Sequence, residues 1–351
     1  MKILFVLRQN KPSDYSTTIK SGLLNSATFI SNFLKKKLGH ETKVVVVFDG
    51  NGINKEIYVF KPNVVILEAI WCPPYKLQEL SELHPKVKWI VRVHSKTPFL
   101  ANEGIALEWL NQYNKIKNTL ISFNSLETNR DYLKLGYKAI YLPNIYFVNK
   151  FPLSFIKVEI EFKRHIKHNV PYAQRKNVLH VGCFGAIRPM KNHLNQAIAA
   201  IEYADKVNRP LFFHINMGRL EQKGEQVLKN LRALFANCKK HHLIEWGWLS
   251  HHEFNYLITK MEFGMQVSFS ESFNIVSADF VANNIPIVVS KDITWMPFLF
   301  RANATNTESI VNKISIMRFF PRITKWLNKL ALFIYNYLNS YYWVQFFGKV
   351  K

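Results

Sequence analysis

Two apolar runs, residues 263–269 and 285–289, enclose the stretch Ser270-Glu271-Ser272-Phe273-Asn274-Ile275-Val276-Ser277-Ala278-Asp279. This order predicts a strand, a turn, a helix and a second strand. Glu271 then falls at the carboxyl end of the first strand, which is where ligands bind in open α/β sheets. The stretch therefore predicts a ligand site as well as a βα unit.

The first turn of the predicted helix supplies backbone donors to this site. Four N–H groups at a helix start have no partner inside the helix and can bind an anion, here those of Phe273, Asn274, Ile275 and Val276. Asp279 lies eight positions after Glu271, two turns along nearly the same face. A carboxylate for hydroxyls, free amides for phosphate and a second carboxylate suit a sugar nucleotide. An ordinary βα unit with a chance acidic pair is the alternative.

The first half of the chain alternates apolar runs with helical patterns. This alternation predicts a parallel, doubly wound sheet. We expect strands at 3–7, 43–48, 63–68, 87–94, 120–123 and 139–142, and helices at 18–38, 77–84, 103–117 and 126–135.

The stretch 151–176 interrupts the alternation, since it is basic and contains two prolines, Pro152 and Pro171. We interpret it as an interdomain segment with a short hairpin at 156–162. The alternation then restarts, with strands expected at 178–184, 211–216 and 243–246 and helices at 193–206, 225–238, 252–260 and 308–316.

The last part of the chain is rich in aromatic residues, and no charged residue occurs from 330 to 347. Helical spacing places Leu327, Leu330, Ile334, Leu338 and Tyr341 on one face. This pattern favours an amphipathic helix packed through that face. A helix at a membrane interface and a membrane span remain as alternatives.

A second ligand-binding pattern opens the second half. The predicted strand at 178–184 ends in a glycine turn that contains Gly185, and Arg188 and Lys191 follow just before a helix. Glycine allows close approach of a ligand to the backbone, and two cations at a helix start suit a diphosphate. A solvated basic turn is the alternative.

The two patterns together resemble glycosyltransferase family 4, whose members have the GT-B fold. The segment from Glu271 to Asp279 resembles the family's Glu-x7-Glu motif, with Asp279 in place of the second Glu, and Gly185, Arg188 and Lys191 resemble its diphosphate element. The resemblance implies two Rossmann-like domains facing a cleft and a last helix that returns to the first domain. We expect an N-terminal acceptor domain at 1–150, a connector at 151–176, a nucleotide-sugar domain at 177–320 and the returning helix at 321–351.

The resemblance also implies roles for single residues. His94, at the end of a predicted strand, matches a histidine near the transferred sugar. Trp248 lies in a segment that resembles the loop packing on the nucleotide base, where an aromatic ring either stacks on the base or fills the core. Arg188 and Lys191 would stabilise the leaving diphosphate, Glu271 would hold sugar hydroxyls and Asp279 would reach the ribose. The implied reaction is retaining, uses a UDP- or GDP-sugar as donor and needs no bound cofactor or metal.

The loop after the first predicted strand departs from the family pattern. Related enzymes carry paired glycines there, whereas this chain retains only Gly22. Lys11, Lys20 and Ser21 are the candidates to replace them. A protein that binds sugar nucleotides without catalysis therefore remains an alternative.

Composition limits the partners. The net charge of +23 indicates an anionic partner, and it leaves a membrane glycolipid or envelope glycan and DNA with a modified base as alternative acceptors. Two other classes of site lack their motifs in this sequence. None of the six aspartates stands two positions from another, so the Asp-x-Asp metal motif of the other main glycosyltransferase fold does not occur, and the absence of a P-loop motif argues against a P-loop NTPase. The amino-terminal run reads as a strand and not as a signal peptide, so we expect a cytoplasmic protein, with contact at the inner membrane face left open.

Overall fold

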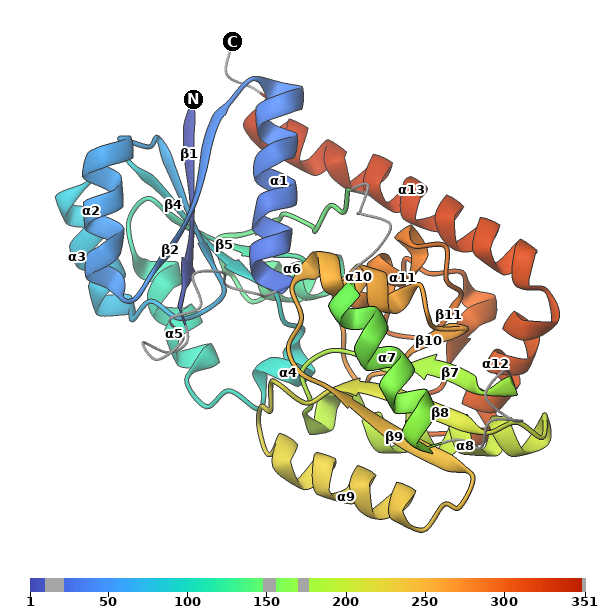
Figure 1. Ribbon diagram of the computed structural model, residues 1–351. Helices are drawn as coiled ribbons and strands as arrows, with labels where there is room; N and C mark the ends of the chain where they lie inside the picture. Colours follow the sequence, from blue (N-terminus) through green and yellow to red (C-terminus); the bar gives the residue numbers. More distant parts are fainter. Residues whose placement is uncertain (10–21, 148–155, 170–176, 349–351) are drawn as a thin grey trace. The chain divides into compact units, whose positions relative to one another are not determined.

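The computed structural model describes residues 1–9, 22–147, 156–169 and 177–348 (Figure 1). The chain divides into two compact units, unit 1 with Met1–Phe147 and Asn336–Lys351 and unit 2 with Val148–Tyr335. Each unit contains a six-stranded sheet in which all paired strands are parallel. The predicted α/β class with two Rossmann-like domains is confirmed.

Unit 1 is a doubly wound α/β unit with strand order β2-β1-β3-β4-β5-β6. Its elements are β1 (Lys2–Arg8), α1 (Gly22–Leu38), β2 (Glu41–Val47), α2 (Gly50–Phe60), β3 (Val64–Glu68), α3 (Pro74–Leu83), β4 (Lys88–Val93), α4 (Thr97–Leu100), α5 (Ala106–Lys115), β5 (Thr119–Phe123), α6 (Leu126–Lys134), β6 (Ala139–Tyr141) and the end of α13 (Pro321–Phe347).

Both faces of the unit 1 sheet are covered, which explains why its strands are almost continuously apolar. Side chains of alternate residues point to opposite faces. Leu4 and Val6 pack with α2, α3 and α5, whereas Ile3 and Phe5 pack with α1 and the end of α13. Trp343 of α13 is fully buried in that second layer, so the predicted return of the last helix to the first domain is confirmed (Figure 1).

Unit 2 has strand order β12-β11-β10-β7-β8-β9. Its elements are α7 (Ile156–Asn169), β7 (Leu179–Gly182), η2 (Pro189–Lys191), α8 (His193–Lys206), β8 (Leu211–Asn216), α9 (Gly224–Ala236), β9 (His241–Trp246), α10 (His251–Ile258), β10 (Phe263–Gln266), α11 (Ile275–Ala282), β11 (Ile287–Ser290), η3 (Phe298–Phe300), β12 (Arg301–Ala302), α12 (Thr307–Phe319) and the first part of α13.

The two faces of the unit 2 sheet are packed differently. On one face, Val181, Phe213 and Met265 form a large apolar core with α8, α9 and α12. On the other face, Phe280 of α11 lies so close to the sheet that a Cβ atom at Gly264 would stand 2.6 Å from its ring. A glycine is therefore needed where α11 crosses β10.

The hairpin expected at 156–162 is wrong, because these residues begin helix α7. Their apolar residues alternate as in a strand, but they also stand four apart as in a helix. The structure buries Val158 and Phe162, while Ile156 and Ile160 stay exposed. Phe162 stacks on His214 of β8, so α7 covers the second face of the unit 2 sheet.

The expected packing face of the last helix is also wrong. Of the predicted face, Leu327 is partly buried against the unit 2 core, but Leu330, Ile334, Leu338 and Tyr341 are exposed, and the buried face of α13 carries other side chains. The buried residues of this helix are Thr324, Asn328, Leu332, Asn339, Trp343 and Phe347. In the part of the chain that the structure describes, no helix combines the length and the apolar character that crossing a bilayer requires.

Candidate functional site

The carboxyl edge of the unit 2 sheet has a switch point between β7 and β10. From β7 the chain moves outward through β8 and β9, and it then crosses to β10 on the other side of β7. Loops that follow such neighbouring strands separate and leave a place for a ligand. The glycine turn follows β7 and the Glu271 segment follows β10, so the topology brings the two predicted patterns together.

Hydrogen bonds fix these two loops to each other. The amide of Phe269 donates to the carbonyl oxygen of Met190 at 2.9 Å, and Gln266 Nε2 donates to the carbonyl oxygen of Phe184 at 2.7 Å. Asn192 Nδ2 donates to the carbonyl oxygen of Val267 at 3.0 Å. The relative position of the loops is thus set by hydrogen bonds within the protein, two of them buried, that need no ligand.

Lys191 and Glu271, both predicted site residues, form an ion pair at this place. Their side chains are only 13% and 10% exposed. Burial alone would raise the pKa of the Glu271 carboxyl, but the charges of Lys191 and Arg188 and the hydrogen bonds from Lys191 and Ser268 together lower it. The backbone amide of Glu271 donates to the carboxylate of Asp292, which follows β11. Glu271 is therefore a fixed, ionised carboxylate.

Arg188 reaches the same edge from the loop after β7. Its guanidinium donates to Glu221 Oε2 at 2.8 Å, and Glu221 also pairs with Arg219. Gly185, in the same loop, has a φ of +119° and no atom within 4 Å of the place where a Cβ would stand. The loop therefore presents an open backbone position close to a cation, as a phosphate group requires.

The start of α11 provides backbone donors. Asn274 has a φ of 59° and caps the helix, since its side chain accepts from the amide of Ser277 at 2.8 Å. Ile275 and Val276 are the first two helical residues. Among the described residues, the amides of these three and of Phe273 have no acceptor. This arrangement suits an anion at the helix start.

Asp279 lies deeper than expected. It is 1% exposed, and its Oδ1 lies 2.8 Å from Nε2 of His251, the first residue of α10. The predicted contact of Asp279 with a ribose would therefore involve His251 as well.

Two aromatic residues of the predicted site have different surroundings. Phe273 is buried and stacks against Trp295 and Tyr335, so its side chain serves the core while its backbone belongs to the site. Trp248 is half-buried after β9, with the Arg219 guanidinium 5.9 Å from its ring. Its ring lies at the same carboxyl edge as Arg188 and Glu221.

In unit 1, His94 follows β4 at the carboxyl edge of that sheet, as predicted. Its Nε2 contacts the carboxylate of Glu68, at the end of β3, and Arg92 NH1 donates to Glu68 Oε2 at 3.0 Å. Burial and the Arg92 charge lower the pKa of His94 despite the opposing effect of Glu68. Arg92 is completely buried and holds Glu68, so its charge serves this cluster and does not face solvent.

Sequence reasoning missed four residues of these clusters: Glu68, Glu221, His251 and Asp292. Glu68 is the last residue of β3, Asp292 follows β11 by two positions and Glu221 lies in the loop after β8, whereas His251 begins a helix. Acidic residues at the carboxyl ends of parallel strands were therefore a usable signal. Lys11, Lys20 and Ser21 lie outside the described residues.

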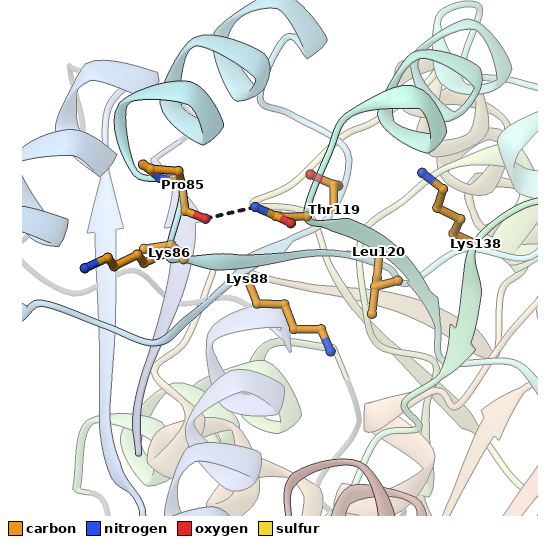
Figure 2. Close-up of a pocket in the computed structure, with 8 residues that line it drawn as sticks. Pro85, Lys86, Lys88, Thr119, Leu120 and Lys138 are labelled. Carbon is orange, nitrogen blue, oxygen red and sulfur yellow. Dashed lines mark hydrogen bonds between the residues drawn. The ribbon is translucent and has the colours of Figure 1, made fainter.

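Two other features do not form a comparable site. Among the described residues no three His, Cys, Asp or Glu side chains gather as a metal site would require. A hollow of about 370 Å³ lies at the opposite, amino-terminal edge of the unit 1 sheet. Figure 2 shows that its lysines Lys86, Lys88 and Lys138 point in different directions, so they do not converge on one ligand.

No protein-family model and no curated protein matches this sequence. Solved structures match its fold. Anabaena HepE in complex with UDP-glucose has a TM-score of 0.64 and 14% identity, over 97% of this chain and 98% of that chain. Trehalose-6-phosphate synthase OtsA has a TM-score of 0.64 and 11% identity, over 99% of each chain. Sucrose-phosphate synthase from Thermosynechococcus elongatus has a TM-score of 0.62 and 12% identity, over 94% and 93%.

These likenesses extend over nearly the whole chain, and they assign it the GT-B fold of two Rossmann-like units. Because the sequence identities are only 11% to 14%, these likenesses assign the fold alone.

Proposed function

We propose that the protein is a glycosyltransferase that moves a sugar from a nucleotide-diphosphate sugar to an acceptor hydroxyl. The observation that carries the proposal is the pairing of Lys191 with Glu271 at the switch point of unit 2, beside the Gly185–Arg188 loop and the open start of α11. The fold supports it, because HepE, which matches over 97% of this chain, was solved with UDP-glucose.

In the proposed reaction the bond between the anomeric carbon and the leaving phosphate oxygen breaks, and its electron pair stays on the diphosphate. The acceptor hydroxyl oxygen forms the new bond to the anomeric carbon, and its proton passes to the leaving phosphate oxygen. Arg188, Lys191 and the amides of Asn274 and Ile275 stabilise the growing negative charge, without a metal ion in this scheme. Donors of this kind, fixed before the reaction, typically contribute a factor of about 10² to 10³ each.

The remaining residues bind the parts of the donor. Glu271, held ionised, accepts hydrogen bonds from sugar hydroxyls. Asp279 and His251 form the ribose end, and Trp248 packs on the base. In this scheme the donor is a UDP- or GDP-sugar, and His94 contacts the transferred sugar. Retention of the anomeric configuration, as in family 4, is part of the proposal.

The acceptor in our proposal is an envelope glycan or a lipid-linked glycan, reached by a cytoplasmic protein at the inner membrane face. Free thiols at Cys72, Cys183 and Cys238 suit a reducing compartment. The net charge of +23 suits an anionic surface, although it equally supports the second candidate, a DNA acceptor with a modified base. The third candidate, a sugar-nucleotide binding protein without turnover, is supported by Asp279 in place of the second Glu and by the single Gly22 where related enzymes carry paired glycines.

Titration calorimetry with UDP, GDP and their glucose and mannose conjugates tests the binding step. We expect one nucleotide family to bind, and Lys191→Met to weaken that binding at least tenfold. Arg232, which pairs with Glu245 on the surface of unit 2, provides the matched control as Arg232→Met. Absence of binding to every nucleotide would refute the proposal.

A further inference from the structure

One face of α13 exposes a regular apolar stripe. In its unit 2 part, Ile323, Trp326, Leu330, Phe333 and Ile334 are exposed, with Trp326 at 63% and Phe333 at 67%. Spacings of three and four residues place these side chains on one side of a helix. Soluble proteins rarely leave such a continuous apolar patch exposed unless something binds it.

The opposite face of α13 is packed against the rest of unit 2. The helix therefore cannot rotate about its axis to bury the apolar stripe. Thr324 and Asn328 are buried on that face, and Thr324 Oγ1 donates to the carbonyl oxygen of Met317 in α12 at 3.2 Å. Leu332, one turn further, is buried as well. The orientation of the stripe toward solvent is therefore a stable property of unit 2.

The stripe lies in a segment of one charge sign. From residue 309 to the end the sequence contains no Asp or Glu, and it contains seven Lys and Arg. Arg322, Lys325 and Lys329 stand three and four positions apart, so they form a basic row along the stripe. Among the described residues none of these three makes an ion pair.

We propose that this basic and apolar face of α13 binds the surface of an anionic phospholipid bilayer. The apolar side chains would enter the boundary between headgroups and acyl chains, where Trp is favoured, while the basic row would contact lipid phosphates. A second copy of the chain fits less well, because it would bring another segment of cations without acidic residues against this one. The proposal depends on α13 alone and is independent of the proposed transferase reaction.

Vesicle sedimentation tests this surface. The full-length protein is mixed with vesicles of phosphatidylcholine alone, or of phosphatidylcholine with about one third phosphatidylglycerol. We expect binding to the anionic vesicles only, weakened by salt. The double variant Trp326→Ser/Phe333→Ser removes apolar contact and keeps every charge, so it should lower the partition coefficient at least tenfold. Substituting Arg322, Lys325 and Lys329 with Gln should lower it about a hundredfold, at about fivefold per cation.

Matched controls are Phe298→Ser, at an exposed phenylalanine elsewhere in unit 2, and Lys229→Gln, at an exposed lysine of α9. Both should bind like the unchanged protein, and unchanged thermal melting should show that all variants are folded. The proposal is overturned if the Trp326→Ser/Phe333→Ser variant binds anionic vesicles normally. It is also overturned if sedimentation shows a dimer that this variant dissociates, or if the protein binds duplex DNA and not vesicles.

Discussion

The ammonium group of Lys191 and the carboxylate of Glu271 form a largely buried ion pair that connects two loops 80 residues apart in the chain. It places a cation for a phosphate directly beside an acceptor for hydroxyls, at the switch point of the unit 2 sheet. A ligand that carries both a phosphate and hydroxyl groups would therefore bind beside this pair, with Lys191 contacting the phosphate and Glu271 the hydroxyls.

A double-mutant cycle on this pair separates its structural role from its chemical role. Lys191→Met and Glu271→Gln should each lower nucleotide release by at least about 10²-fold. Lys191→Met leaves a buried carboxylate unpaired and should destabilise the protein by about 3 kcal/mol, whereas the double variant should recover most of that loss. Recovered stability without recovered activity is the expected result, measured by urea unfolding and by release assays. Activity close to that of the unchanged protein in either single variant would remove the pair from the mechanism.

Glu68 should be among the residues most important for stability in unit 1. It is completely buried between Arg92 and His94, and these two charged or polar neighbours lower its pKa although burial alone would raise it. Glu68→Gln leaves the Arg92 guanidinium buried without a counter-charge, so we expect a loss of about 3 to 5 kcal/mol of unfolding free energy.

The control is Glu41→Gln, which breaks an exposed pair with Lys2 and should cost less than about 1 kcal/mol. Urea unfolding under the same conditions gives the unfolding free energy of each variant and of the unchanged protein. If the Glu68→Gln and Glu41→Gln variants have equal unfolding free energies, the buried cluster does not depend on the Glu68 carboxylate.

Acid should destabilise unit 2 through its buried histidines. Burial lowers the pKa of His193 to about 3 and that of His180 to about 4, and it holds the pKa of His214 well below the usual value. The unfolded chain then binds more protons than the folded one, so stability falls as the pH drops below about 6.5 and continues to fall to about 4.

His193→Leu provides the test, because it removes one of these groups from a buried position. Its unfolding free energy should depend less steeply on pH between 6.5 and 4 than that of the unchanged protein. The difference expected for one histidine over this range is about 3 kcal/mol. Parallel curves for the two proteins would show that His193 titrates normally in the folded state.

The strands other than β12, and the meeting of the Arg188–Lys191 and Glu271 segments at one sheet edge, could be predicted from the sequence. Buried parallel strands are continuous apolar runs, and the sheet rule places their carboxyl ends together. Helix α2 was missed. Its start, Asp49-Gly50-Asn51-Gly52, has the composition of a turn, yet Asp49 caps the helix by accepting from the amides of Asn51 and Gly52. Local composition did not show that tertiary packing would extend this turn into a helix.

The errors at α7 and α13 have one physical cause. In α7 the apolar residues fit a strand and a helix equally, and only the space over His180 and His214 selects the helix. In α13 both sides of the helix are apolar, and the side with Asn328 and Trp343 is the buried one. Which of two apolar faces becomes buried depends on the surface that the helix packs against. The spacing of apolar residues within one helix carries no information about that surface.

The most direct test of the central claim is release of the nucleotide from a panel of UDP-, GDP-, ADP-, CMP- and dTDP-sugars, with a pool of candidate acceptors and with Glu271→Gln as control. We predict turnover of one donor family, lost in the control, and a product whose anomeric proton shows the configuration of the donor. Binding of a donor without release of nucleotide, with every acceptor tried, would contradict the assignment as a transferase. It would leave a sugar-nucleotide binding protein in its place.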